Sequence, residues 1–293
     1  MPAPIDEFFL DPKVVRASFD AASTTVDAAA VVHGEIRARL IERLDVVRLT
    51  PSVIVDLGAG TGHASRALRD RYSSAQVVAI DLSTRMLQRA SKQQRLFRRF
   101  DRVAADAHRL ALKDGVADMV FSNLMLQWCS DPDLVFAEIR RVLRPDGLLT
   151  FTSLGPDSLR ELRTAWSSVD NYTHVHRFID MHDLGDALMR AGFSEPVMDT
   201  QRLTITYRSV DALLQELRGS GSENAAHGRR RGLTGRRALE RVREEYETQR
   251  RDGVLPATLE VVYGHAWAIE RQPRRKEGGE VRVPVAQLGR RKG

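Results

Sequence analysis

The residues of this chain whose types and spacing could do chemistry begin with a glycine-rich segment, Asp56-Leu57-Gly58-Ala59-Gly60-Thr61-Gly62. It directly follows the apolar run Val53-Ile54-Val55, which is typical of a short buried strand. Glycines at such a place allow a tight strand-to-helix turn and let a ligand come close to the backbone. The spacing is G-x-G-x-G, whereas dinucleotide-binding loops have G-x-G-x-x-G. A plain surface turn and a nicotinamide-cofactor loop remain the alternatives.

A second acid follows the next expected strand, which runs from Gln76 to Ile80. Asp81, with Leu82 beside it, stands where a carboxylate can accept hydrogen bonds from both hydroxyls of a ribose. Asp106 and Ala107 come after a short possible strand, Arg102 to Ala104. Three such features in order are more specific than one glycine-rich turn.

The elements that must position these residues alternate between strand and helix about every 20–30 residues, which indicates a doubly wound α/β fold with a parallel sheet. We expect helices over 13–48, 64–72, from Ser83 and over 132–143, and further strands over 116–121 and 148–152. Beyond these we expect helices over 157–169, 182–191, 210–217 and 234–250, and strands over 201–207 and 259–267. Val281–Val283 could add an edge strand.

The composition excludes several classes of protein. The 293 residues are 42% hydrophobic and 29% charged, as in folded soluble domains, and no apolar run approaches the roughly 20 residues of a membrane span. The chain starts without the features of a signal peptide, and its one cysteine, Cys129, excludes an intramolecular disulfide framework. We therefore expect a cytoplasmic protein with no membrane partner. The net charge of +6, with 40 Arg and 5 Lys, favours an anionic partner.

The acid–glycine–acid order resembles the first motifs of class I S-adenosylmethionine-dependent methyltransferases. The resemblance implies a Rossmann-like sheet, mostly parallel with an antiparallel last strand, N-terminal helices and a helical lid. It also implies S-adenosyl-L-methionine as the methyl donor, released as S-adenosyl-L-homocysteine. The cofactor-binding residues would be Asp56, Gly58, Gly60, Gly62, Asp81, Leu82, Asp106, Ala107 and Asn123, with Asp106-Ala107 at the adenine edge.

The block Ser122-Asn123-Leu124-Met125-Leu126-Gln127-Trp128-Cys129 narrows the substrate class. It lacks the D/N-P-P-Y/F motif of many nucleic-acid amino-methyltransferases, which argues against nucleic acid as partner. The block resembles the malonyl-[acyl-carrier protein] O-methyltransferases of biotin synthesis, as do Gly155 to Leu162, His174 to Phe178 and Leu214 to Gly221. Val26 departs from this family, which often has Tyr there, and Ala59 stands where Cys is common.

The resemblance implies O-methylation of the free carboxylate of malonyl bound to an acyl carrier protein, a step toward pimeloyl in biotin synthesis. That carboxylate is already ionised at neutral pH, so the reaction needs no acid or base residue, only positioning. Arg177 would hold the carboxylate and Trp128 would line the pocket, although an exposed arginine and a core tryptophan are the plainer readings. Arg229, Arg230 and Arg231 would bind the acidic carrier unless they are merely solvated surface.

We expect one methyltransferase domain over 1–270, with a helical cap over about 10–48, a lid over about 209–250, and a basic tail over 271–293. The spacing of the histidines predicts no metal site. Three alternatives remain: a homologue of the complex I assembly factor that hydroxylates arginine, another small-carboxylate methyltransferase, and a non-catalytic binding protein. Gly221 to Asn224 and Leu255 to Thr258 are the features shared with the first alternative.

Overall fold

The computed structural model describes residues 9–29, 31–230 and 232–269. Its centre is a seven-stranded sheet with the order β3-β2-β1-β4-β5-β7-β6. All neighbours from β3 to β5 are parallel, whereas β7 runs antiparallel to both β5 and β6. The expected sheet, mostly parallel with an antiparallel last strand, is confirmed. The strands are β1 Val53–Leu57, β2 Gln76–Asp81, β3 Asp101–Ala104, β4 Ala117–Asn123, β5 Leu143–Leu154, β6 Ser194–Tyr207 and β7 Leu255–Trp267.

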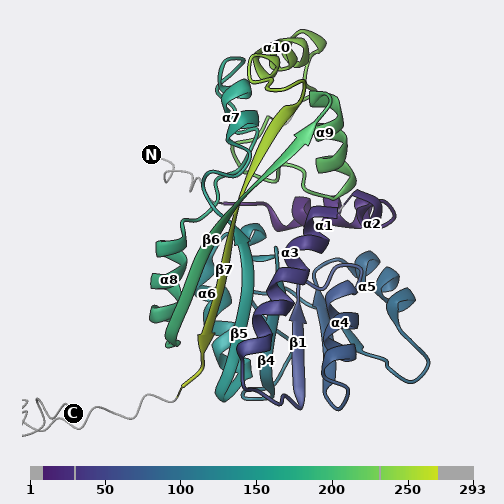
Figure 1. Cartoon of the computed structure of the whole chain (residues 1–293), viewed down its shortest axis with the longest axis vertical. Coiled ribbons are helices and arrows are strands. Elements are labelled where there is room, and N and C mark those ends of the chain that lie inside the picture. The colour runs from purple at the N-terminus through teal and green to yellow at the C-terminus, as the bar shows by residue number, and fades with distance from the viewer. Residues whose placement is uncertain (1–8, 30, 231, 270–293) are drawn as a thin grey trace, which may run out of the picture.

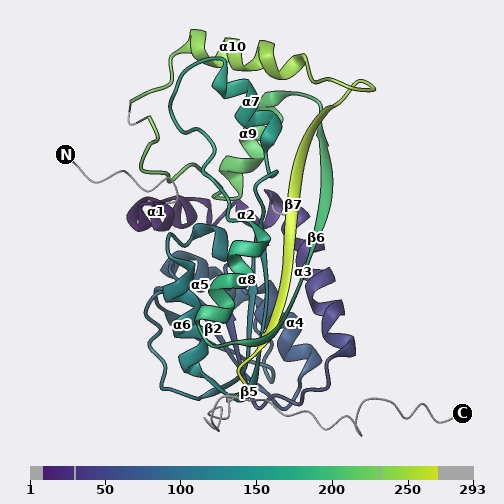
Figure 2. The ribbon, with the colours of Figure 1, turned by 90° about the vertical axis from the view of Figure 1, so that its left-hand side faces the viewer.

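Helices cover both faces of the sheet, as a doubly wound fold requires. One core contains α3, α4 and α5 against one face, with Leu40, Leu68 and Ala90 fully buried. The other contains α6 and α8, with Phe136 and Leu188 fully buried. Figure 2 shows α3 and α4 on one side of the strands and α6 and α8 on the other. These helices are α3 Val31–Glu42, α4 His63–Arg71, α5 Thr84–Ala90, α6 Pro132–Val142 and α8 Met181–Arg190.

The N-terminal segment is not the single helix that its composition predicts. It forms α1 Pro12–Ala22, α2 Val26–Ala29, α3 and a 3-10 turn at Arg43–Val46. The break falls at Ser23 and Thr25, whose hydroxyls donate to the carbonyls of Asp20 and Ala22 at 2.9 and 3.2 Å. Such local bonds compete with helix continuation. As a result α1 and α2 lie across the carboxyl ends of the strands (Figure 1).

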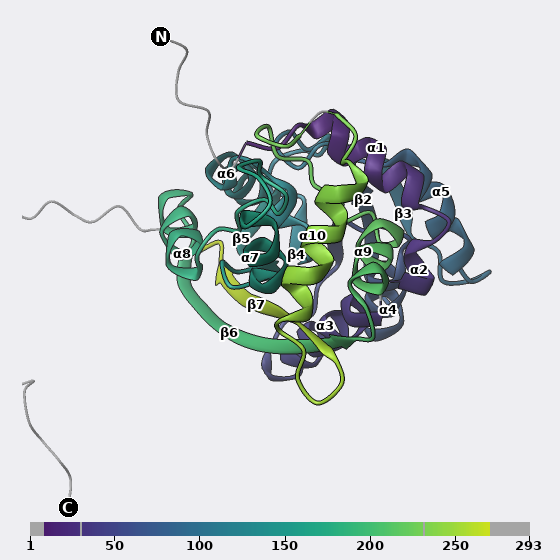
Figure 3. The ribbon, with the colours of Figure 1, turned by 90° about the horizontal axis from the view of Figure 1, so that it is seen from above.

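Three helices form a layer beyond those strand ends: α7 Arg160–Ser167, α9 Val210–Gly219 and α10 Arg236–Glu247. They pack with the extended upper halves of β6 and β7 around a third core that includes Trp166, Leu213 and Tyr246. Seen from above, α10 lies between α7 and α9 (Figure 3). Both strands are longer than predicted: β6 begins at Ser194 rather than Gln201, and β7 at Leu255 rather than Leu259. The extra residues of β6 pair with Val262–Trp267 and those of β7 with Thr204–Tyr207, and local alternation cannot reveal such pairing between strands. The expected tail and edge strand lie outside the described residues.

Candidate functional site

The glycine-rich loop connects β1 to α4, and its three glycines all have positive φ: 77° at Gly58, 54° at Gly60 and 83° at Gly62. A Cβ on Gly58 would lie 2.4 Å from Cγ of Met125, and one on Gly62 would lie 2.8 Å from Cβ of Ala90. A Cβ on Gly60 would meet no atom within 4 Å. The loop is therefore pressed against protein at its two ends, and it faces open space at Gly60.

Asp81, at the end of β2, fixes the position of this loop. Its Oδ2 accepts from the backbone N–H of Gly60 and its Oδ1 from that of Ser83, both at 2.8 Å. Burial raises the pKa of Asp81 to about 6, although these two hydrogen bonds oppose the rise. Each oxygen keeps a lone pair for a ligand hydroxyl.

Asp56, at the end of β1, is 1% exposed and accepts a hydrogen bond of 2.5 Å from the hydroxyl of Ser65 on α4. Burial raises the pKa of Asp56 to about 7; the bond from Ser65 works against this, and the charge of Asp81 adds to it. A cationic group bound beside Asp56 would favour the ionised carboxylate. The buried carboxylate of Asp56 could therefore pair with an ammonium or a guanidinium group.

Asp106 follows β3 and is held by the residue two positions along the chain. Its Oδ1 accepts from the backbone N–H of His108 at 2.9 Å and lies 2.7 Å from Nδ1 of the imidazole. Burial pushes the pKa of Asp106 up, but the bonds and charge of His108 outweigh it, and the pKa ends below its usual value. Asp106 is therefore an anionic acceptor at neutral pH.

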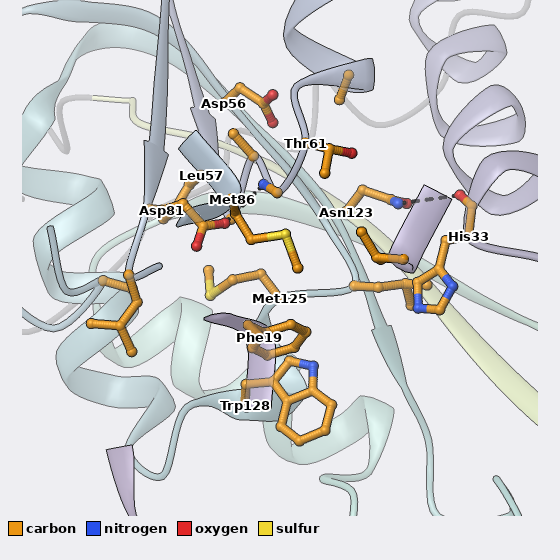
Figure 4. Close-up of a pocket in the computed structure, with 18 of the residues that line it drawn as sticks. Phe19, His33, Asp56, Leu57, Thr61, Asp81, Met86, Asn123, Met125 and Trp128 are labelled. Carbon is orange, nitrogen blue, oxygen red and sulfur yellow. Dashed lines mark hydrogen bonds between the residues drawn. The ribbon is translucent and has the colours of Figure 1, made fainter. Parts of the chain in front are cut away.

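These elements surround a cavity of about 280 Å³ at the carboxyl ends of β1, β2 and β4. Figure 4 shows Asp56, Thr61 and Asp81 on one side of it, Met86 and Met125 in the middle, and Phe19 beside Trp128 on the other. Eight of the nine predicted cofactor-binding residues line it: Asp56, Gly58, Gly60, Asp81, Leu82, Asp106, Ala107 and Asn123. Gly62 does not, because it faces Ala90 and Phe100 instead.

The N-terminal helices supply lining residues to which no role was given from the sequence. Asp27 accepts a hydrogen bond of 2.5 Å from the hydroxyl of Thr61, which joins α2 to the glycine loop. His33 and Arg37 are one turn apart on α3, and both line the cavity. Burial lowers the pKa of Arg37, while the carboxylates of Asp56 and Asp27 hold it up. The i, i+4 spacing of His33 and Arg37, which places both on one helix face, was the sequence signal that could have identified them.

Asn123 connects the end of β4 to α3. Its Nδ2 donates to the main-chain carbonyl of His33 at 3.4 Å, the dashed line in Figure 4, and its Oδ1 accepts from Thr152 at 2.9 Å. Leu124 follows with φ 54°. Burial, with the charge of Arg37, lowers the pKa of His33 to about 4, so its imidazole is neutral.

A second cavity of about 100 Å³ lies between the sheet and the layer of α7 and α9. It shares four lining residues with the first cavity: His33, Leu124, Trp128 and Ser220. Trp128 contacts Phe19 of α1 edge to face, with ring centroids 5.2 Å apart, and its ring centroid is 5.0 Å from that of His176. Trp128 therefore lies between the two cavities and lines both of them. Pocket lining was one of the two interpretations of Trp128 from the sequence, and core packing was the other.

The predicted substrate-binding arginines that the structure describes, Arg177, Arg229 and Arg230, do not line these two cavities. Arg177 lines neither of these two cavities; it is exposed, whereas its chain neighbours His176 and Phe178 are buried. Arg229 donates to a main-chain carbonyl at 3.1 Å, and Arg230 lies 3.9 Å from Asp170. Arg231 lies outside the described residues. The placement of Arg177 gives no support to its holding a carboxylate in these cavities.

Within the described ranges, no cluster of three or more His, Cys, Asp or Glu side chains could hold a metal ion, and no helix is long and apolar enough to cross a membrane. Burial raises the pKa of the Cys129 thiol to about 12, so it is not a nucleophile at neutral pH.

Comparisons with known proteins agree with this geometry. Residues 55–151 match the family model for a methyltransferase domain. Solved structures of a putative methyltransferase from Bacillus halodurans and of YcgJ from Bacillus subtilis share the fold, with TM-scores of 0.58 and 0.59 at 17% and 14% identity. Each similarity covers 80% of this chain and 98% or 99% of the other.

The curated relatives are much more similar. The malonyl-[acyl-carrier protein] O-methyltransferase of Laribacter hongkongensis is 51% identical over 280 residues, which cover 92% of this chain and 94% of that protein. The enzyme of the same name from Methylovorus sp. is 51% identical over 269 residues, 89% of this chain and 90% of that one. With a methyltransferase fold, an acid–glycine–acid cavity and relatives at this identity, the chain belongs to the malonyl-[acyl-carrier protein] O-methyltransferase family.

Proposed function

We propose that this enzyme transfers the methyl group of S-adenosyl-L-methionine to the free carboxylate of a malonyl group carried as a thioester on an acyl carrier protein. The observation that carries the proposal is the pair of adjoining cavities, one lined by the acid–glycine–acid set and one largely apolar, which share Trp128 and Leu124. The names of the curated relatives support the substrate, and they do not favour the arginine hydroxylase alternative.

The residues of the first cavity fit the methyl donor. Asp81 has free acceptor capacity for the ribose hydroxyls, and Asp106 is an anionic acceptor for the exocyclic amine of adenine. The charges of Asp56 and Arg37 interact across the first cavity. Asp56 would face the ammonium group of the methionine moiety, and Arg37 would face its carboxylate. When bound, the donor supplies an electrophilic methyl group on a positively charged sulfur.

The protein's own contribution is to position the acid and exclude water. Among the described residues that line the second cavity there is no Arg or Lys. A carboxylate that enters from the second cavity therefore keeps its lone pairs available, because no guanidinium among the described residues of that cavity neutralises it. Phe19 and Trp128 close the space between α1 and β4. Holding nucleophile and acceptor carbon in line is the kind of effect that supplies ~7–11 kcal/mol.

The carrier protein would dock near the layer of α7, α9 and α10. Arg229 and Arg230 remain the proposed contacts to its acidic surface, together with Arg177, which is exposed. Exposed ion pairs contribute little affinity each, and they affect association rates and salt dependence more. Weaker association at high salt is the expected signature.

The test offers donor with a labelled methyl group and malonyl carrier protein to the purified enzyme. Label should enter the acyl group and be released by mild alkaline hydrolysis as methanol. Failure of transfer, with donor binding confirmed by calorimetry, would refute the proposal.

Asp81→Asn tests the donor site. This change removes the charge and one acceptor, and we expect it to weaken donor binding at least tenfold. Asp101→Asn is the matched control, since Asp101 lies exposed at the start of β3 and its carboxylate accepts only from Gln76 among the described residues. Equal affinity in the two variants would contradict the role of Asp81.

A further inference from the structure

The polar side chains that line the second cavity are mostly engaged with one another or with the backbone. His174 is 2.7 Å from Asp170 through Nε2 and stacks on Trp166 at 3.5 Å. Asn224 donates to a main-chain carbonyl, and Ser220 donates to another at 3.0 Å. The side chains of His174, Ser220 and Asn224 therefore already have hydrogen-bond partners within the protein.

Two side chains differ from these. Gln127 and His176 line the same cavity at 8% and 5% exposure, and Oε1 of the first and Nε2 of the second have no hydrogen-bond partner. Leaving a buried acceptor unpaired costs free energy, and each such case in a folded protein calls for an explanation.

The chemical character of both atoms is fixed by their neighbours. Nε2 of Gln127 donates to the carbonyl of Leu124 at 2.8 Å, which sets the amide orientation and leaves Oε1 as a pure acceptor. Burial, with the charge of Arg163, lowers the pKa of His176 to about 4, although a hydrogen bond to the backbone of Gln127 opposes this, so the ring is neutral. Because Nε2 is unpartnered, we assign that bond to Nδ1, which leaves Nε2 with the lone pair.

Two acceptors in one cavity require a donor. The described lining has no Arg or Lys and includes the acid Glu216, so an anion has no partner there. The matching ligand group is a hydrogen-bond donor without negative charge, and the amide N–H is one such group. The remaining walls, such as Leu159, Leu213 and Leu259, suit methylene groups.

On the function proposed above, we propose that Gln127 and His176 accept hydrogen bonds from the amide N–H groups of the pantetheine arm that carries the malonyl thioester. The second cavity then holds the arm, and the shared wall at Trp128 directs the acyl end toward the first cavity. The pair makes the enzyme selective for thioesters whose carrier arm contains a nearby secondary amide.

The experiment compares two small substrates of equal length, the malonyl thioesters of N-acetylcysteamine and of pentanethiol, of which only the first has an amide. The variants are Gln127→Leu and His176→Phe, the latter of which keeps a ring between Trp128 and Phe178. His174→Phe is the matched control, because His174 lines the cavity with its Nε2 already engaged. Melting curves and binding of pantetheine, measured by calorimetry, accompany the kinetics.

The wild type should prefer the amide-bearing thioester in kcat/KM. N-acetylcysteamine has one amide N–H, so the variant that removes its acceptor should lower that preference about fivefold, the equivalent of about 1 kcal/mol for one hydrogen bond. Both variants should weaken the binding of pantetheine, which has two amides. His174→Phe should leave the preference within twofold. Because the preference is a ratio within one variant, partial loss of folded protein does not change it.

The two proposals fail in different ways. If the wild type methylates both thioesters and the preference is the same in all variants, the acceptor role is wrong and the proposed function stands. If no malonyl thioester, that of the carrier protein included, accepts a methyl group, the proposed function itself fails.

Discussion

The glycine loop allows the same chemical change, Gly→Ala, to be made at two positions, one of which should mainly lower stability and the other mainly weaken ligand binding. At Gly62 the added methyl would lie 2.8 Å from Cβ and 3.2 Å from Cα of Ala90, at φ 83°. A positive φ costs a non-glycine residue ~1–2 kcal/mol, and overpacking adds ~1–3 kcal/mol. Since alanine also restricts the unfolded chain by ~0.4–1 kcal/mol, we expect Gly62→Ala to lower the free energy of unfolding by roughly 2–4 kcal/mol.

At Gly60 the same methyl meets no protein atom within 4 Å and lies on the wall of the first cavity. Only the cost of φ 54° remains, partly offset in the unfolded chain, so we expect a net loss of about 1 kcal/mol. The methyl would instead occupy space needed by the ligand. Gly60→Ala should therefore weaken donor binding by more than tenfold while the protein stays nearly as stable as the wild type.

Urea denaturation and calorimetric titration with S-adenosyl-L-homocysteine separate the two effects. In thermal melts each kcal/mol corresponds to about 2–4 °C for a chain of this size. A Gly60→Ala variant as unstable as Gly62→Ala, or one that binds with unchanged affinity, would refute the placement of Gly60 on the ligand side of the loop.

Three further predictions concern other parts of the molecule. Burial raises the pKa of Asp56 from 3.8 to about 7, so between these pH values the folded state holds a proton that the unfolded state has lost. The free energy of unfolding should therefore fall as the pH rises from about 4 to 7. In Asp56→Asn this part of the pH dependence, measured by urea denaturation, should vanish. Phe19→Ala removes the ring against Trp128, and we expect weaker donor binding and faster donor release by stopped-flow, with a melting temperature within a few degrees of the wild type. Glu161 is 6% exposed and accepts hydrogen bonds from the backbone N–H and the hydroxyl of Thr258. Glu161→Gln should therefore lower the free energy of unfolding by ~1–3 kcal/mol. A change below about 0.5 kcal/mol in urea denaturation would contradict this.

The first cavity was largely predictable because its residues lie at the ends of parallel strands. A glycine turn after β1 and an acid after β2 meet at one edge of the sheet whatever the rest of the chain does. Strand β4 pairs with both β1 and β5, which places Asn123 at the same edge.

The N-terminal helices were harder to predict because their composition favours helix throughout. The break at Ser23 and Thr25 depends on side-chain bonds to the preceding turn, and the hydroxyl of Thr25 also donates to the carbonyl of Gly219 at 2.8 Å. Arg37 gains a role only once α3 lies over β1. Arg177 was chosen for its charge, but in the fold it is exposed while its neighbours His176 and Phe178 are buried, and charge alone does not decide which neighbour faces inward.

The second cavity depends on contacts that no local pattern contains. Gln127 comes from the 3-10 turn Leu126–Trp128 after β4 and His176 from the segment before α8. The other walls come from α3, β5, α7, β6, α9, β7 and the loop that follows α9. A family motif can mark Gln127 and Trp128 together, yet it cannot distinguish the side chain that is fully bonded from the one left with an open acceptor. That distinction is a property of the folded chain. It makes the unpartnered atoms, rather than the charged residues, the best guide to which part of the substrate this cavity receives.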